Sequence, residues 1–511
     1  MDLTRKLTDT ILFSILSYLI QLPFILPPSA GDPGLVLLVV CRRWRYIILH
    51  SANQWSKMVV SPTVSSNRFN ANVEFDRCWL NVDIQRHSGH WLDIFLLHVP
   101  KAPPSPQNSD TGNTCSDEIS ILENIVLPPA KRAKCLSLPF CSNRAAEIFL
   151  TAPAGQFYFL ESVEISFLKC GQYEVAGTEE SRMKCSKPIT VFQNVPFLHR
   201  VSIITHNGLN PLTLLLPWHQ LTTINMGFTT IHLKVFRTIL SKSSPSLSTG
   251  FFTVKFSPKK RSPSTLYINQ NPTPRIVAPA LKHLHLRLID PSLDCDIFTR
   301  IRLPALISFR VDLHDCNAGW MMNIYQPLLC SSSSTLEMLT FLDLQGFGCA
   351  HGLAVHLDGP RRNTPQIQQD LQSLFSILPM VRVLRLPFGL YIPKAAMELI
   401  SLGKLLPQLE TLKVASSTGV DILTMVNDRN EVAYLLSEPV GSSSAAPSTC
   451  DVPSHFSEVV LWTSTPQEPS VTSCVASIQS LSSSQKTKFR IFYADQMQRG
   501  PRFRMYRGVC I

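Results

Sequence analysis

The stretch Val40-Cys41-Arg42-Arg43-Trp44, followed by Ile47 and Ile48 and then by Trp55, decides how the N-terminal part of the chain is interpreted. Upstream of it, apolar residues recur at steps of three and four, at Leu7, Ile11, Leu12, Ile15, Leu16 and Leu19. This spacing places an apolar stripe on a helix that begins near Thr8 or Asp9, because either side chain can accept hydrogen bonds from the free N–H groups of the first turn. The pattern predicts a small helical module over residues 1–60.

The order of these parts resembles the F-box: a Leu-led amphipathic helix, a loop, an apolar run that ends in Cys41-Arg42-Arg43-Trp44, and a closing Trp55. Farther along, Trp79-Leu80, a Ser88-Gly89 turn and a strand-like Leu92-Asp93-Ile94 are similar to the sequence that follows the F-box in many basidiomycete F-box proteins. The resemblance implies an all-α, three-helix module that docks on a Skp-type adaptor of a cullin ubiquitin ligase. The rest of the chain would then hold a target protein.

The resemblance also implies which residues are shared between the core of the module and the adaptor interface. Trp44 and Trp55 are expected to fill the core against Leu16, Val40 and Ile48. The residues expected to bind the partner are Leu7, Ile11, Leu12, Ile15, Leu16, Val40, Cys41, Trp44, Ile48 and Trp55.

Two departures from the family pattern leave an alternative open. F-boxes commonly open Leu-Pro-x-Glu-Ile-Leu, whereas this chain reads Leu7-Thr8-Asp9-Thr10-Ile11-Leu12, without the Pro and the Glu. The loop Gln21–Gly34 contains four prolines and is longer than usual for the family. The alternative is an interaction scaffold whose F-box no longer docks.

From about residue 133 onward the pattern apolar-x-x-apolar-x-apolar recurs, which is typical of the strands of leucine-rich repeats. The eleven matches are Ala133-Leu136-Leu138, Leu160-Val163-Ile165, Leu198-Val201-Ile203, Leu221-Ile224-Met226, Phe251-Val254-Phe256, Leu281-Leu284-Leu286, Leu306-Phe309-Val311, Leu339-Leu342-Leu344, Val381-Leu384-Leu386, Leu409-Leu412-Val414 and Phe456-Val459-Leu461. Five of them have a proline two places before the first apolar residue: Pro196, Pro279, Pro304, Pro379 and Pro407. Proline suits a corner where a connecting segment ends and a strand begins, because it cannot continue a helix.

These patterns predict an α/β fold, in which a small all-α F-box-like module precedes an irregular leucine-rich-repeat-like α/β solenoid. Amphipathic spacing predicts connecting helices over Gln368–Leu378 and Ala395–Leu406. The expected organisation is the module at 1–60, a connecting strand segment at 61–100, a flexible linker at 101–120, the solenoid with loop insertions at 121–490 and a basic tail at 491–511. A stack of strands also presents the side chains between its core positions as a broad binding face.

The positions between the core residues of the predicted strands carry many charged side chains. They include Glu161, Glu164, His199, Arg200, Lys282, His283, His285, Arg310, Asp343, Arg382, Arg385, Glu410 and Lys413. They are expected to be solvated, mixed in sign and slightly basic, which favours an acidic or mixed target. The chain of 511 residues has a formal charge of +11, but charged residues make up 16% of it and do not gather in one run, so no nucleic-acid partner is expected.

The sequence contains no phosphate loop, no G-x-G-x-x-G after a strand and no nucleophile elbow. No cofactor or metal is expected, and an interaction protein is favoured over an enzyme. A second alternative is a membrane anchor over residues 11–26, although Ser14, Ser17, Tyr18, Gln21 and Pro23 interrupt that apolar run. The favoured prediction is a soluble intracellular protein of the cytoplasm or nucleus.

Overall fold

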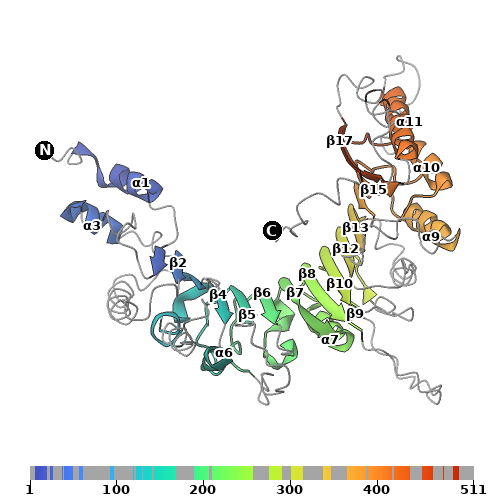
Figure 1. The fold of residues 1–511 in the computed structure, drawn as a ribbon. Helices are drawn as coiled ribbons and strands as arrows, with labels where there is room; N and C mark the ends of the chain where they lie inside the picture. Colours follow the sequence, from blue (N-terminus) through green and yellow to red (C-terminus); the bar gives the residue numbers. More distant parts are fainter. Residues whose placement is uncertain are drawn as a thin grey trace, which may run out of the picture. The chain divides into compact units, whose positions relative to one another are not determined.

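Parallel strands that follow one another in the sequence form the framework of the fold (Figure 1). The computed structural model describes residues 6–19, 24–26, 37, 40–49, 57–60, 92–96, 119, 122–128, 130–140, 143–167, 189–205, 210–256, 276–289, 301–314, 338–346, 365–386, 390–416, 419–437, 452–463, 473, 476 and 487–493. The chain divides into two units, Met1–Ile231 (unit 1) and His232–Ile511 (unit 2). Both are mixed α/β with parallel strand pairing.

In unit 1 each strand pairs in parallel with the one before it. The strands are β1 (Phe24–Leu26), β2 (Lys57–Val60), β3 (Leu92–Leu96), β4 (Ala133–Phe140), β5 (Ser162–Phe167), β6 (Arg200–Thr205) and β7 (Thr223–His232). The helices are α1 (Asp9–Leu19), α3 (Arg42–Leu49) and α6 (Asn143–Leu150). Shorter helical turns are η3 (Leu122–Val126), η4 (Ala130–Arg132), η6 (Pro211–Thr213) and η7 (Trp218–Gln220).

Unit 2 continues the same kind of pairing. Its sheet runs through β8 (Thr249–Lys255), β10 (His283–Ile289), β12 (Ser308–His314), β13 (Phe341–Gly346), β14 (Val383–Arg385), β15 (Thr411–Ser416), β16 (Glu458–Thr463) and β17 (Lys488–Tyr493). Two short strands, β9 (Ile276–Val277) and β11 (Ile301–Arg302), pair with each other. The helices are α7 (Leu233–Ser243), α9 (Pro365–Ser376), α10 (Lys394–Ser401) and α11 (Val420–Ser437).

The repeated apolar positions lie in register across neighbouring strands. In unit 1, the residues at the second position pair in the order Leu136, Val163, Val201 and Ile224. In unit 2, they pair in the order Leu284, Phe309, Leu342, Leu384, Leu412 and Val459. All of these side chains are buried, and burying one such side chain contributes about 1.5–3 kcal/mol. The core is therefore a continuous row of apolar side chains within each unit.

Each of the five prolines at the predicted corners occupies the second position of a hydrogen-bonded turn. The backbone N–H of the first apolar residue donates to the carbonyl of the residue before the proline, as from Leu198 to Val195 and from Leu409 to Leu406. The same bond closes the other three corners, where Leu281, Leu306 and Val381 are the donors. Proline favours this place in a β-turn because its φ angle is already near the value required.

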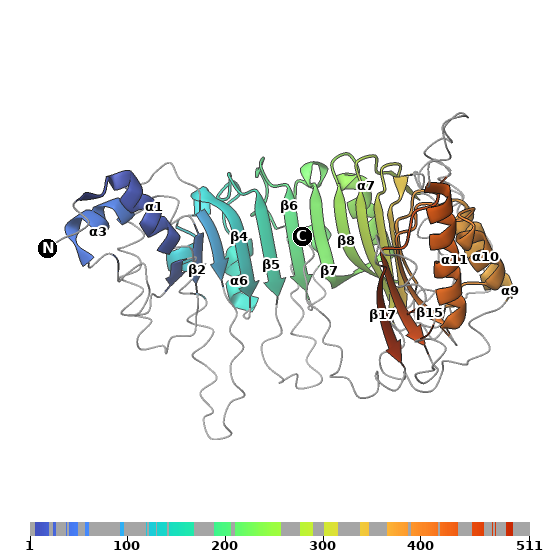
Figure 2. The ribbon, with the colours of Figure 1, turned by 90° about the horizontal axis from the view of Figure 1, so that it is seen from above.

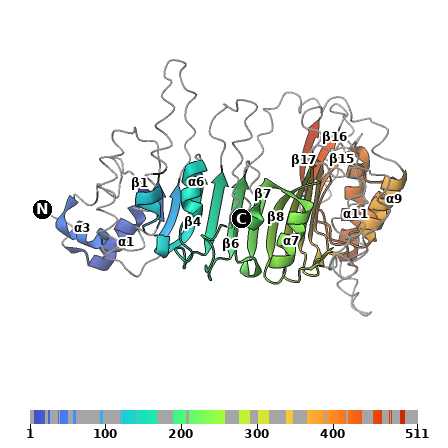
Figure 3. The same ribbon diagram turned by 90° about the horizontal axis from the view of Figure 1, so that it is seen from below.

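Helices cover one face of the strands in each unit. Figure 3 shows α6 over β4 in unit 1 and α7 over β8 in unit 2. Figure 2 shows α10 and α11 packed side by side next to the last strands of unit 2. The connecting helices predicted near 368–378 and 395–406 are present as α9 and α10, but α10 ends earlier, because Gly403 and Leu406 adopt positive φ angles in the turn that leads to Pro407.

The module predicted over residues 1–60 contains the helices α1 and α3, but it is not all-α, because this range also contains β1 and β2. Residues Phe24–Leu26 lie within the proline-containing stretch expected to be a loop, and they pair in parallel with Met58–Val60. The β-branched and aromatic content of these short segments suits a strand. Through β2 and β3, the sheet of unit 1 therefore begins well before residue 121.

The prediction of a repeat at Phe251-Val254-Phe256 is wrong by four residues. The register places Gly250 and Phe252 beside Leu284 and Leu286, so the repeat in β8 is Leu247-Gly250-Phe252. A Cβ atom added to Gly250 would lie 2.6 Å from the ring of Phe252. The Phe252 ring therefore occupies the space that the apolar side chain of the other repeats fills.

Candidate functional site

The two helices of the N-terminal part pack through one stripe of α1. Leu12 and Leu16 are 1% and 0% exposed, and Ile47 of α3 is also buried. Thr8 caps α1, because its hydroxyl oxygen accepts a hydrogen bond from the backbone N–H of Ile11. Residues four apart lie on the same side of a helix, so Leu12 and Leu16 form one row.

A second apolar row of α1 faces away from this core. Ile11 and Ile15 are 49% and 43% exposed, and Tyr18 and Leu19 continue the row one turn later. Val40, just before α3, and Tyr46, within α3, are exposed as well. Ile11, Ile15, Tyr18, Leu19, Val40 and Tyr46 are called the N-terminal apolar face below. Contiguous exposed apolar surface is common where proteins bind other molecules, so this face is the first candidate surface.

Arg43 connects the starts of the two helices. Its Nε donates to Asp9 Oδ1 at 2.8 Å, and its Nη2 donates to the backbone carbonyl of Leu7 at 2.6 Å. Trp44 is half-buried, and its backbone N–H donates to the Sγ of Cys41. The Cys-Arg-Arg-Trp segment therefore holds α3 against α1, and Arg43 is a structural residue whose role sequence analysis did not identify.

The residues predicted to bind a partner separate into three groups. Ile11, Ile15 and Val40 are exposed, Leu12 and Leu16 are core residues, and Leu7, Cys41 and Trp44 are half-buried. The side chain of Ile48 and all of Trp55 lie outside the described residues. Val40 was expected in the core and is not there. Tyr18 and Tyr46 were missed, although Tyr18 follows Ile11 and Ile15 at helical spacing.

The second candidate surface is the face of the unit 2 sheet that carries the residues between the apolar positions. Alternation along a strand directs these side chains to the opposite face from Leu284 and Leu286. Across the strands they form the row Phe251, His285, Arg310, Asp343, Arg385, Lys413, Val460 and Arg490. This surface is called the polar face of unit 2.

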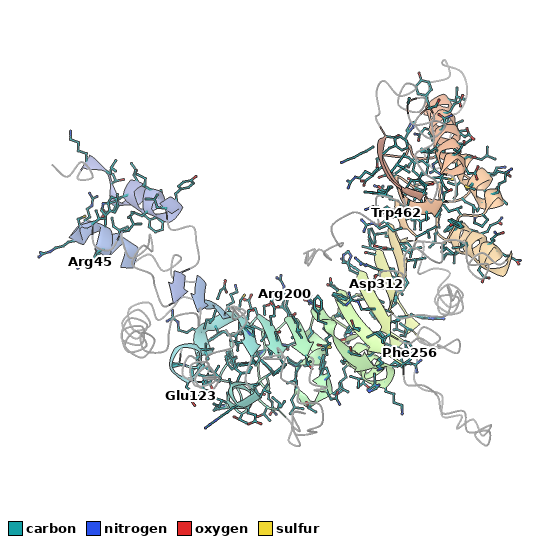
Figure 4. The ribbon with its side chains drawn as sticks, viewed as in Figure 1. Arg45, Glu123, Arg200, Phe256, Asp312 and Trp462 are labelled. Atoms are coloured by element: carbon teal, nitrogen blue, oxygen red, sulfur yellow. The ribbon has the colours of Figure 1, made fainter. Side chains whose placement is uncertain are left out.

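Two carboxylates are fully buried within the polar face. Asp312, labelled in Figure 4, accepts hydrogen bonds from His285 Nε2 at 2.8 Å and from Arg310 Nε at 3.0 Å. Asp343 accepts one from Arg385 Nη1 at 3.2 Å. The prediction that Asp343 is a solvated strand residue is therefore wrong, because cations from neighbouring strands enclose it.

The pKa values of these two carboxyl groups move in opposite directions. Burial acts to raise the pKa of Asp312, but His285 and Arg310 together outweigh it and lower that pKa below its ordinary value. For Asp343, burial is again the largest influence, and the neighbouring charge of Asp312 adds to it. Arg310 and Arg385 do not compensate fully, so the pKa of Asp343 is raised.

On strands β14 to β17, the described cations of the polar face outnumber the described carboxylates. Lys413 lies in register with Arg385, and Arg490 lies two strands farther along the same row. Burial, followed by the charge of Arg385, lowers the pKa of Lys413, and Arg490 contributes to the same shift. Arg490 forms an ion pair with Glu458 at 2.7 Å. This end of the face is therefore crowded with positive charge.

Arg429 of α11 is completely buried and is not part of either surface. Its guanidinium group donates to the carbonyls of Ser454, Ile400, Leu406 and Pro407, and it lies over the ring of Phe456. Burial lowers its pKa to about 10. Arg429 therefore joins α10, the Pro407 corner and the segment before β16.

Across the described ranges, no group of three or more His, Cys, Asp or Glu side chains is arranged to hold a metal ion. None of the helices described is long and apolar enough to cross a membrane. The run 11–26, considered as an anchor, includes the end of helix α1 at Leu19 and the separate strand β1. No protein-family model matches the chain, and the comparison with curated proteins found no match.

Proposed function

We propose that the chain is the substrate-recognition subunit of a Skp-cullin-F-box type ubiquitin ligase, and that residues 1–60 bind a Skp-type adaptor. The observation that carries this proposal is the N-terminal apolar face, which lies on α1 and beside the Cys-Arg-Arg-Trp segment, where the F-box resemblance implies the adaptor interface. Covering apolar surface contributes roughly 25 cal/mol per Å², so a partner that buries Ile11 and Ile15 gains affinity from them.

We further propose that the strands and helices are turns of an irregular leucine-rich-repeat-like α/β solenoid. The in-register apolar positions within each unit and the five proline corners support this interpretation. In such a fold, each repeat buries its apolar side against the next and leaves the alternate positions for binding. The target would bind to these alternate positions, of which the polar face of unit 2 is the most highly charged part described.

The receptor would make no chemical bond itself. It would raise the effective concentration of target lysines near a ubiquitin-loaded enzyme held elsewhere in the complex. The competing proposal is a repeat scaffold without adaptor, and the absence of the family's Pro and Glu from Leu7-Thr8-Asp9-Thr10-Ile11-Leu12 favours it.

Co-expression of the full chain with a Skp-type adaptor, followed by size-exclusion chromatography, tests the proposal. The unmodified chain should elute as a stoichiometric complex. Combined replacement of Ile11→Asp and Ile15→Asp should abolish the complex, because both side chains are exposed and the change places charge in the interface. Leu12 is unsuitable for this test, since it is a core residue of the helix pair.

The matched control is Leu435→Asp with Leu436→Asp on α11, which are 60% and 51% exposed and lie in the other unit. This control should retain the adaptor. Retention of the adaptor by the folded Ile11/Ile15 variant would contradict the proposed interface. Failure of the folded, unmodified chain to bind any adaptor would favour the scaffold.

A further inference from the structure

Four cations gather on the last strands of unit 2: Arg385 on β14, Lys413 on β15, and Lys488 and Arg490 on β17. They are called the cationic cluster. Arg385, Lys413 and Arg490 lie in one row of the register, and Lys488 lies beside Glu458 in the next row. With neighbouring strands about 4.8 Å apart, the row from Arg385 to Arg490 covers about 14 Å.

Within the described strands, the carboxylates near the cluster do not balance its charge. Asp343 bonds to Arg385 but is fully buried and also lies 3.9 Å from Arg310, and Glu458 is paired with Arg490. Among the residues that the structure describes, these two carboxylates face the four cations of the cluster, and Arg310 adds a cation that is itself bonded to Asp312. The mutual repulsion of Arg385, Lys413 and Arg490 is relieved when an anion approaches, and this gain adds to the direct attraction.

An apolar surface lies next to the cluster on the same strands. Trp462 of β16, labelled in Figure 4, stacks on Phe492 of β17 with ring centroids 6.3 Å apart. Ala415 of β15 lies in register with Trp462, so a small side chain stands beside a large ring. Trp462 is half-buried, which leaves part of the ring for contact with a ligand.

We propose that the cationic cluster and the Trp462–Phe492 pair form a docking site for an acidic protein segment that carries a bulky apolar side chain. Its carboxylates would pair with Arg385, Lys413 and Lys488, and its apolar residue would pack on Trp462 beside Ala415. This inference deepens the proposed function and rests on it, because it assigns a chemical class to the target that the receptor would hold.

Glu458 favours a protein segment over a nucleic acid. It pairs in register with Lys488, forms an ion pair with Arg490, and its charge acts on Lys413. A nucleic acid carries a negative charge on every nucleotide and would bring phosphates against Glu458. A protein segment can place a neutral residue at that point, with carboxylates on either side.

Fluorescence anisotropy with the full chain and short labelled peptides tests the site. The probes are an extended Glu-rich peptide with one Phe, the same peptide with Gln in place of every Glu, and an oligo-dT strand of similar length. At an ionic strength of about 0.15 M, the Glu-rich peptide should bind at least ~10-fold more tightly than the Gln peptide, and added salt should weaken its binding.

Combined Lys413→Gln and Lys488→Gln should weaken binding of the Glu-rich peptide by about 10-fold. Phe492→Ser should weaken binding of the Phe-bearing peptide. It should have a smaller effect on binding of an otherwise identical peptide that has Ala in place of Phe. The matched control is Lys394→Gln with Lys404→Gln, because both residues are exposed and the change in charge is equal. Lys394 begins α10, which lies on the helical side of the sheet, and Lys404 lies in the turn after that helix. Circular dichroism establishes that each variant is folded.

Three results would overturn the proposal: equal affinity for the Glu and Gln peptides, tighter binding of oligo-dT than of the Glu-rich peptide, or equal weakening by the Lys394/Lys404 control. The Ile11/Ile15 variant tests the two proposals independently. It should no longer bind the adaptor but should bind the Glu-rich peptide as tightly as the unmodified chain does. If the unmodified chain binds the peptide but no adaptor, the docking site is supported and the ligase role is refuted.

Discussion

Asp312 and Asp343 occupy neighbouring strands and are both fully buried, yet their surroundings shift their pKa values in opposite directions. The pKa of Asp312 lies below its ordinary value. Asp312 therefore stabilises the fold at pH values above the ordinary pKa, and this contribution is lost as the pH falls through the folded-state pKa. Asp343 has a raised pKa, so its contribution is present at low pH and is lost as the pH rises through that raised pKa.

The two carboxylates should therefore respond differently to the same substitution. At pH 7, Asp312→Asn should lower the free energy of opening of β12 by about 1.5–3 kcal/mol, because it removes hydrogen bonds between charged groups. Asp343→Asn should raise the opening free energy of β13, because a neutral amide avoids the cost of a buried charge. Native-state hydrogen exchange measures both quantities.

Acidification provides the internal control for this pair. Below the folded-state pKa values the carboxyls are protonated, and the advantage of Asp343→Asn should disappear. A loss of stability of similar size in both variants at pH 7 would contradict the assignment of opposite pKa shifts.

Among the strands of unit 2, β8 differs by having Gly250 at the position that apolar residues occupy in its neighbours. The ring of Phe252 lies over Gly250 and also meets Phe236 of α7 edge to face, with centroids 5.2 Å apart. Phe252 thus fills two places in the core: its own position in the repeat and the space beside Gly250.

This arrangement predicts coupling between the two residues. Gly250→Ala should destabilise β8 by about 1–3 kcal/mol, since the added methyl group meets the ring. Phe252→Ala should cost about 3–5 kcal/mol through the cavity that it leaves. The double variant should cost less than the sum, because the methyl group enters the vacated space. Hydrogen exchange of the β8 amides tests this, and strict additivity would contradict it.

Within each unit, the strands pair with their neighbours in one regular order, and this limits how far the effect of a local change extends. In unit 2, Arg429 links α10, the Pro407 corner and the segment before β16 through four carbonyls. When contacts are confined to neighbouring repeats, stability is close to a sum of local terms. A defect at Arg429 should therefore stay within unit 2.

Arg429→Met should lower hydrogen-exchange protection of β15 and β16 by about 3 kcal/mol or more, because it leaves several buried carbonyls without donors. Protection of β4, β5 and β6 in unit 1 should not change. Leu138→Ala is the reciprocal variant: it should cost about 2–5 kcal/mol in unit 1 and leave unit 2 unaffected. Loss of protection in both units from either variant would contradict local stability.

Sequence alone predicted those parts of the fold that depend on neighbouring residues in the chain. The apolar-x-x-apolar-x-apolar pattern located most strands, because alternate residues of a strand always face the same side. Pro279 and Pro304 marked turns, since proline restricts its own φ angle wherever it occurs. The stripe through Leu12 and Leu16 likewise predicted α1, because helical spacing is a property of the segment itself.

Tertiary structure decided what depends on contacts between distant segments. The sequence of α1 offers two apolar rows, and the position of α3 selects Leu12 and Leu16 for the core and leaves Ile11 and Ile15 exposed. Asp343 has the same place in its repeat as Lys413, but cations on adjacent strands surround the first, whereas like charges crowd the second. The sequence pattern determines which face of a helix or strand a residue occupies. Its burial and its electrostatic surroundings depend on the neighbouring helix or strand.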